Sequence, residues 1–330
     1  MSVQRQPTAT AWPPSAAVRH SIAVLIPCRN EAATVARVVA DFRAALPQCR
    51  VYVYDNGSSD GTSEIALGAG AIVRRETRPG KGVVVRRMFA EVDADIYVLV
   101  DGDATYDASR APDLVAALVA DDLDMVTSVR DDGGQVAAYR RGHRLGNRAF
   151  NNLLGILFGV RPSDMLSGYR VFSRRFVKSF PGTARGFEIE PELTVHALEQ
   201  RLPTGEIRTA YVGRPGGSTS KLSTWRDGLR ILWKTAMLFR DERPLMLFGA
   251  FAGMFAAAGL ILGGGVVVEY METRLVPRLP TAILATGLML LAFLSLGCGL
   301  ILNHVVRGRR EAKRLAYLAI GARSGTGRDD

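Results

Sequence analysis

Two long uncharged runs near the C-terminal end of the sequence constrain its fold more than any other feature. Pro244–Val268 contains no charged residue, and Leu279–Val306 contains no Asp, Glu, Lys or Arg. Each run exceeds the roughly 20 apolar residues that an α-helix needs to cross a bilayer. Core helices of soluble proteins seldom run so far without a charge. We therefore expect two transmembrane helices, at about residues 244–268 and 279–306.

Basic residues on the outer flanks of these runs predict the orientation. Arg240 and Arg243 precede the first run, and a cluster that includes Arg307 and Arg309 follows the second. The connecting loop has two arginines balanced by two glutamates. By the positive-inside rule, the chain is expected to be a multi-pass protein of the inner (cytoplasmic) membrane, with both termini and the preceding domain in the cytoplasm.

The net charge of +10 also bears on partners. Much of the basic surplus flanks apolar segments, which favours contact with membrane lipids over nucleic acid. Glycines four residues apart, such as Gly249 and Gly253, would let helices approach closely, so a homo-oligomer remains an open alternative. The three cysteines have no metal-binding spacing and predict no disulfide framework.

The region from Ser21 to about Val212 alternates short apolar runs with amphipathic stretches, which predicts a parallel β-sheet covered by helices on both faces. The expected strands are Ile22–Ile26, Val51–Tyr54, Ile96–Val100 and Met125–Val129. The expected helices are Ala33–Leu46, Thr62–Ala69, Val83–Val92 and Pro112–Ala120. Residues 1–20 are expected to be a disordered leader. Residues 223–243 are expected to form a basic amphipathic helix in the membrane interface, and residues 307–330 a basic cytoplasmic tail.

Polar clusters follow three of the expected strands: Pro27–Glu31, Asp55–Thr62 and Asp101–Thr105. Ligands of such sheets bind at the carboxyl ends of the strands, so three clusters there indicate a site rather than three unrelated turns. Asp101 and Asp103 could hold Mg²⁺ or Mn²⁺ together with substrate phosphates. Gly80-Lys81-Gly82 precedes an expected helix, where glycines and a lysine suit a bound phosphate group.

Seven segments, taken together and in order, resemble glycosyltransferase family 2, specifically its polyprenyl-phosphate branch. That branch includes dolichol-phosphate mannose synthases and bacterial polyprenyl-phosphate glucosyltransferases. The segments are Ile26–Glu31, Asp55–Thr62, Gly80–Gly82, Asp101–Asp103, Ser167–Arg170, Gly186–Glu190 and Ser220–Leu222. The resemblance implies an α/β fold: a Rossmann-like GT-A catalytic domain with a mostly parallel sheet at residues 21–222, followed by the interfacial helix and the two transmembrane helices.

The resemblance also implies roles for individual residues. Pro27, Asn30, Glu31 and Asp55 would bind the nucleotide of the donor. Asp101 and Asp103 would bind its ribose and the metal, and Lys81 and Lys221 would face its diphosphate. Arg130 and Arg144 would hold the phosphate of an acceptor lipid, and Arg170 is included with Asp103 among the expected catalytic residues.

The expected activity is therefore the inverting transfer of a hexose from a nucleotide diphosphate sugar to polyprenyl (undecaprenyl) phosphate. Two positions depart from the family pattern. Asn56 replaces a second aspartate found in many members, and Thr105 stands where mannose synthases often have Gln, which favours a UDP-sugar over GDP-mannose. Two alternatives remain open: a membrane-anchored transferase acting on a glycan or protein, and a non-catalytic membrane assembly partner.

Overall fold

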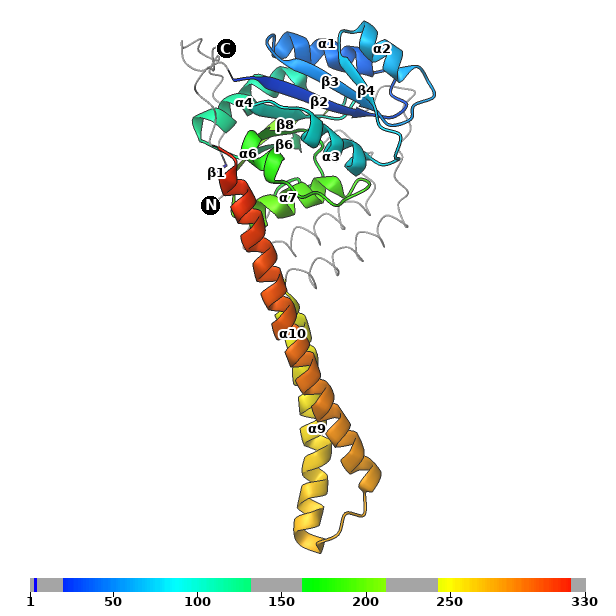
Figure 1. The fold of residues 1–330 in the computed structure, drawn as a ribbon, viewed down its shortest axis with the longest axis vertical. Helices are drawn as coiled ribbons and strands as arrows, with labels where there is room; N and C mark the ends of the chain where they lie inside the picture. The colour runs from blue at the N-terminus through cyan, green and yellow to red at the C-terminus, as the bar shows by residue number, and fades with distance from the viewer. Residues whose placement is uncertain (1–2, 5–19, 132–161, 212–242, 322–330) are drawn as a thin grey trace. The chain divides into compact units, whose positions relative to one another are not determined.

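The computed structural model describes residues 3–4, 20–131, 162–211 and 243–321 (Figure 1). The chain forms two compact units. One contains Met1–Thr224 together with Lys313–Asp330, and the other contains Trp225–Ala312. Arg144 and Lys221 lie outside the described residues. Residues 223–242 of the expected interfacial helix and most of the expected leader also lie outside them.

The first unit is built on a mixed β-sheet. In the described residues its order is β1-β8-β6-β7-β5-β2-β3-β4, and every pairing is parallel except those of β7 with β5 and β6. The strands are β1 Val3–Gln4, β2 Ile22–Cys28, β3 Arg50–Asp55, β4 Ile72–Arg75, β5 Ile96–Leu99, β6 Met125–Asp131, β7 Arg170–Ser173 and β8 Thr204–Ala210. β1 lies within the expected leader and pairs with β8.

Helices cover both faces of this sheet (Figure 1). One face packs against α1 Val35–Ala45, α2 Thr62–Gly68, the short 3₁₀ helix η1 Ala108–Arg110 and α4 Ala111–Ala120. The other packs against α3 Lys81–Glu91, α6 Arg174–Ser179 and α7 Ile189–Glu199. Successive strand residues point to opposite faces, so Val24 and Ile26 enter the first core and Ala23 and Leu25 the second. Strands buried on both faces must be apolar throughout, as β2 is.

The four expected strands and four expected helices are all present, with ends shifted by a few residues. The expectation of a mostly parallel sheet is confirmed, because β7, between β5 and β6, is the one antiparallel strand among those described. Strands β4, β7 and β8 lack the apolar run that marks a buried strand. β8, for example, has the sequence TGEIRTA, and only Thr209 of it is fully buried.

The second unit contains α9 Pro244–Thr273 and most of α10 Leu279–Ala319. Both helices are long and apolar enough to cross a membrane, each with a mean hydropathy of 2.2. Gly259 faces α10, because a Cβ there would lie 3.1 Å from Met289 Cγ, whereas nothing lies within 4 Å of Gly249 or Gly253. Helix α10 continues past Val306, where the apolar run ends, as far as Ala319.

Candidate active site

The three polar clusters lie side by side because the strands that carry them are neighbours. β2 pairs with β3 on one side and β5 on the other, with Cys28 opposite Asp55 and Leu25 opposite Leu99. The carboxyl ends of these parallel strands therefore meet at one edge of the sheet. This register places Asp55 and Asp101 at the same edge of the sheet, and their role in a binding site stays a prediction.

The loops after β2 and β3 hold each other in place. Asn30 donates its backbone N–H to Ser58 Oγ at 2.8 Å, and its side-chain Oδ1 accepts the N–H of Ser59 at 2.9 Å. The N–H of Glu31 donates to Thr62 Oγ1 at 2.9 Å. Asn30 has a φ of 52°, a left-handed conformation that asparagine tolerates. Asn30 and Glu31 thus lie against the β3 loop, as expected for one binding surface.

Asp55 is buried, and its carboxylate organises the loop that follows β3. Oδ1 accepts the N–H of Ser58 at 3.0 Å, and Oδ2 accepts the hydroxyl of Ser63 at 3.0 Å. Pro27 lies in β2, directly before Cys28, which is the residue that pairs with Asp55 of β3. Direct contact of Pro27 and Asp55 with a nucleotide stays a prediction.

Asn56 fixes the segment that leads to Lys81. Its Nδ2 donates to the carbonyls of Glu76 at 3.0 Å and Arg78 at 2.8 Å, while its Oδ1 accepts the N–H of Gly80 at 2.7 Å. The side chain is 7% exposed. A carboxylate can only accept hydrogen bonds, so an aspartate at this position could not make the two contacts to carbonyl oxygens.

Lys81 lies between two carboxylates, those of Asp101 and Glu190. Its Nζ forms ion pairs with Asp101 Oδ1 and, at 2.5 Å, with Glu190 Oε1. Burial lowers the pKa of Lys81, but the charges of both carboxylates outweigh this effect and raise it. Lys81 is therefore an ammonium ion held at the metal-ligand candidate Asp101. The motif Gly186–Glu190 was recognised in the sequence, but the pairing of Glu190 with Lys81 was not expected.

A glycine allows a second segment to approach Asp101 closely. A Cβ on Gly168 would lie 2.3 Å from Asp101 Oδ2, a distance that no side chain could occupy. The N–H of Gly168 donates to the hydroxyl of Tyr106 at 2.8 Å, which holds this segment over the β5 loop. The Ser167–Arg170 motif therefore forms part of the wall around Asp101.

Arg170 is buried below this wall and supports it. Its guanidinium donates to the carbonyls of Ser167 at 3.0 Å and Met165 at 2.6 Å, and to Thr194 Oγ1 at 2.8 Å. The side chain has no exposed surface. The expectation that Arg170 acts directly in catalysis is corrected by this burial: Arg170 ties residues 165–168 to α7 and cannot reach a substrate here.

Asp101 and Asp103 are separated by one residue in the loop that follows β5. Asp103 is 4% exposed, and its Oδ1 accepts the hydroxyl of Thr105 at 2.6 Å. Among the described residues no group of three or more His, Cys, Asp or Glu side chains could hold a metal. Two carboxylates nevertheless fit Mg²⁺ or Mn²⁺, because such a hard cation typically takes its other oxygen ligands from substrate phosphates and water. Asp101 also lines a cavity of about 570 Å³ with Tyr106, a volume that suits a small-molecule ligand.

Arg130 lies near the carboxyl end of β6 and is held by an acidic partner that was not anticipated. Its Nε and Nη2 donate to the two carboxylate oxygens of Asp164 at 2.7 and 2.9 Å. Its guanidinium also lies 5.4 Å from the ring centroid of Tyr211. A lone Asp outside every motif carried no signal that would have predicted this pair.

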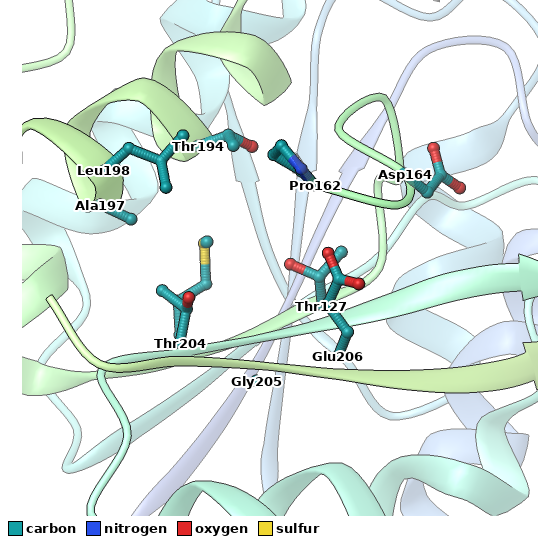
Figure 2. Close-up of a pocket in the computed structure, with 10 residues that line it drawn as sticks. Thr127, Pro162, Asp164, Thr194, Ala197, Leu198, Thr204, Gly205 and Glu206 are labelled. Carbon is teal, nitrogen blue, oxygen red and sulfur yellow. The ribbon is translucent and has the colours of Figure 1, made fainter. Parts of the chain in front are cut away.

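Asp164 also lines a small cavity, shown in Figure 2, together with Thr127 of β6 and Glu206 of β8. Its volume of about 30 Å³ is about that of one water molecule. The cavity is too small for a sugar.

Comparison with known proteins supports an assignment to a family. The sequence model of the family described as glycosyl transferase family 2 matches residues 23–180 of the chain. Glycosyltransferase AglJ of Haloferax volcanii is 34% identical over 252 residues, which are 76% of this chain and 82% of AglJ. The chain belongs to glycosyltransferase family 2. The loop after β5, with Asp101 and Asp103, lies within the residues that match this family.

Two further proteins resemble the chain. A dolichyl-phosphate hexose transferase of Haloferax volcanii is 28% identical, over 67% of this chain and 95% of that protein. The structure of glucosyl-3-phosphoglycerate synthase from Mycobacterium tuberculosis in complex with Mn²⁺, UDP and glucosyl-3-phosphoglycerate has a TM-score of 0.53 and 25% identity. The match covers 66% of this chain and 80% of the synthase. The catalytic domain thus has the GT-A fold.

Proposed function

We propose that this glycosyltransferase moves a hexose from a nucleotide diphosphate sugar to the phosphate of a polyprenyl phosphate at a membrane. The observation that carries the proposal is the cluster of Asp101, Asp103 and Lys81 at the carboxyl edge of the sheet, in a chain that also has two membrane-length apolar helices. The similarity to a dolichyl-phosphate hexose transferase supports the same acceptor class.

The residues of the site suit a direct displacement. Asp101 and Asp103 would hold Mg²⁺ or Mn²⁺ on the donor diphosphate, where the metal supplies positive charge for the leaving group. The acceptor phosphate is largely a dianion at neutral pH, so its oxygen can attack the anomeric carbon without losing a proton. The bond from that carbon to the diphosphate breaks, and the nucleoside diphosphate leaves with the electron pair. One such displacement inverts the anomeric configuration.

The acceptor phosphate also needs positively charged groups to hold it, and Arg130 is the candidate within the described residues. Asp164 holds its guanidinium by two hydrogen bonds, which fixes the orientation of the guanidinium plane. A positioned arginine presents planar donors to a phosphate, which a lysine does not. Arg144 would add a second cation, as the sequence predicts.

We further propose that the catalytic domain and both termini are cytoplasmic, and that a UDP-sugar is the donor. The topology is supported by the end of α10: Lys313 and Tyr317 contact residues of the catalytic unit. The segments before α9 and after α10 then lie on the same side of the membrane. Basic residues flank the hairpin on that side.

A transfer assay with defined substrates tests the function. Purified protein is given UDP-glucose, UDP-galactose or GDP-mannose with undecaprenyl phosphate, undecaprenol, or a protein or glycan acceptor. We expect a product only with the phosphorylated lipid, and NMR of the sugar should show an inverted anomeric centre. Transfer to undecaprenol or to a protein would overturn the acceptor assignment, and absence of transfer from every donor would favour a non-catalytic assembly partner.

The site itself is tested in the same assay. Asp103→Ala should abolish most of the transfer while the protein stays folded, because the metal would lose one of its two carboxylates. Asp121→Ala, which removes an exposed carboxylate just after α4, is the matched control and should keep full activity. Equal activity of the Asp103 variant, or equal activity with excess EDTA, would show that the metal site is wrongly assigned.

A further inference from the structure

The end of α10 belongs to the catalytic unit, although the helix begins in the apolar hairpin. Residues from Lys313 onward group with Met1–Thr224 rather than with the hairpin. We call Lys313–Ile320 the docking segment. The sequence predicted only a basic tail here, so the contacts of this segment with the catalytic domain are new.

Tyr317 is the buried centre of the docking segment. Its ring is 8% exposed and packs in the core cluster that contains Phe172 and Phe176. Its hydroxyl donates to Asp124 Oδ2 at 2.8 Å, and the other oxygen of Asp124 accepts the hydroxyl of Ser173 at 2.5 Å. A buried carboxylate bound on both oxygens is a specific contact, because a misplaced partner would leave the charge uncompensated.

Two flanking contacts extend the interface. Lys313 Nζ lies 2.6 Å from Glu199 Oε2, and the side chain of Glu199 is only 4% exposed. Arg175 donates from Nε to the carbonyl of Ile320 at 3.3 Å, and its guanidinium lies 5.6 Å from the ring centroid of Tyr317. The segment is thus held at both ends and in the middle by residues of the catalytic domain.

The docking segment contacts the far ends of two elements that carry site residues. Asp124 immediately precedes β6, whose other end carries Arg130, about 20 Å away for a strand of this length. Glu199 ends α7, and Glu190 lies in the first turn of this helix, about 14 Å away along its axis. The segment therefore lies too far from the site to contact substrates, and any effect on the reaction must come through placement of the domain.

We propose that the docking segment attaches the catalytic domain to the apolar hairpin at a second point, so that the site is presented to an acceptor held in the membrane. Without docking, the domain is joined to the hairpin only through the chain that precedes Pro244. A second attachment restricts the domain's motion and raises the effective concentration of the site at the bilayer surface. The proposal rests on the proposed function, since it assumes a lipid-held acceptor.

The experiment compares two acceptors that differ in where they are held. Undecaprenyl phosphate in phosphatidylglycerol vesicles is held by the bilayer, whereas citronellyl phosphate is short enough to act from solution. The variants are Tyr317→Phe, which removes only the hydroxyl, and Lys313→Ala with Tyr317→Phe. We expect the double variant to lose at least about tenfold of kcat/KM with the vesicle acceptor, because the effective concentration falls. Its KM for the donor and its rate with citronellyl phosphate should stay unchanged.

A merely structural role predicts a different pattern. If docking only stabilised the domain, both acceptors would be used equally poorly by the variants, and this result would overturn the proposal, as would full activity with both. The swap of Lys313→Glu with Glu199→Lys should restore vesicle activity that Lys313→Glu alone loses. A swap that restores nothing would count against the ion pair.

Docking can also be measured without any acceptor. Hydrogen exchange of the backbone amides of residues 313–320 should be faster in Tyr317→Ala than in the wild type, and unchanged exchange would overturn docking itself. A wild-type protein that shows the slow exchange but transfers sugar to neither phosphorylated lipid would instead contradict the proposed function. The two failures are therefore distinguishable.

Discussion

Asn56 stands where many members of the family have an aspartate, and its side-chain amide makes contacts that a carboxylate could not make. Its amide joins three backbone groups of the segment 76–80, and Lys81 follows directly. The sequence marked Asn56 only as a departure from the pattern with a second Asp. Its reason is visible in the structure, because only an amide can donate to two carbonyls and accept from an N–H at once.

We expect Asn56→Asp to weaken donor binding. The variant loses two donors and sets a carboxylate against two carbonyl oxygens, so residues 76–80 should shift and carry Lys81 with them. The loss of buried hydrogen bonds predicts at least about tenfold weaker affinity for the nucleotide sugar, which calorimetry can measure. Gln48→Glu makes the same amide-to-acid change at an exposed position and should leave the affinity unchanged. Equal affinities of Asn56→Asp and the wild type would contradict this role.

His196 makes stability depend on pH. Its ring packs between Phe176 and Phe180, and neither nitrogen has a hydrogen-bond partner among the described residues. Burial and, to a smaller degree, the charge of Lys313 lower its pKa to about 4. In the unfolded chain the pKa is about 6.5, so the unfolded state binds the proton first. The contribution of neutral His196 is complete above about pH 6.5 and is lost as the pH falls toward 4.

We therefore expect the Tm of the wild type to fall more steeply than that of His196→Phe between about pH 7 and about pH 4.5. Phenylalanine fits the same aromatic surroundings and binds no proton. Thermal unfolding of both proteins in the same detergent, followed across this range, gives the difference in slope. Parallel curves would show that the histidine is not held neutral in the fold.

The limits of sequence reasoning at this scale are clearest for Arg170 and Asp101. Both belong to motifs, but Asp101 was also expected at the site because it directly follows an expected buried strand, whereas Arg170 was assigned by its motif alone. Asp101 does lie at the site edge, because the end of a buried parallel strand fixes where the following residue emerges. Arg170 begins a strand whose surroundings come from α7 and residues 165–168, so its burial depends on tertiary contacts that no local pattern reports.

At the scale of elements, the close approach of residues 167–168 to the β5 loop defines the site wall. We expect Gly168→Ala to lower kcat by at least about a hundredfold, because a Cβ 2.3 Å from Asp101 Oδ2 must displace the carboxylate of this metal-ligand candidate. Gly68→Ala, at the end of α2 with nothing within 4 Å of its Cβ position, is the matched control. Steady-state kinetics of both variants check this, and wild-type kcat in Gly168→Ala would be incompatible with the wall.

The strands that the sequence predicted and those that it missed differ in composition. β2, β3 and β5 are mostly apolar and β6 begins with Met125 and Val126, because helices cover both faces of these strands. β4 contains two arginines in four residues, and β7 begins with a buried arginine, so neither has the composition of a buried strand. The antiparallel direction of β7 follows from long-range pairing and could not be predicted from local periodicity.

At the scale of the whole molecule, the apolar runs and their basic flanks predict a hairpin through the membrane. We expect periplasmic-reporter and cytoplasmic-reporter fusions at Arg274 and at Arg323 to indicate opposite sides, with Arg323 in the cytoplasm. An alkaline phosphatase fusion should be active only at Arg274, and a green fluorescent protein fusion should fluoresce only at Arg323. Reporters on the same side at both positions would remove the second span.

The two apolar runs could be predicted because a helix that crosses the hydrocarbon core of a membrane must be apolar along that length. The return of the chain to the catalytic domain could not, because it depends on a single tyrosine and on charges that are far apart in sequence. Lys313 and Glu199 are separated by more than a hundred residues, and each alone looks like an ordinary charged residue on a helix.

The ion pair between Lys81 and Asp101 has a consequence for the order in which ligands arrive. A free Mn²⁺ ion would have to displace the ammonium group from Asp101, whereas Mn²⁺ already bound to a nucleotide diphosphate brings anionic oxygens that Lys81 can turn to. We expect Mn²⁺ alone to bind weakly and to bind much more tightly once UDP is present, as measured by electron paramagnetic resonance. Lys81→Met should strengthen binding of the free ion while impairing turnover. The enzyme would then bind the metal ion together with the donor, so kinetics should show ordered addition of the ligands rather than binding of the metal before the donor.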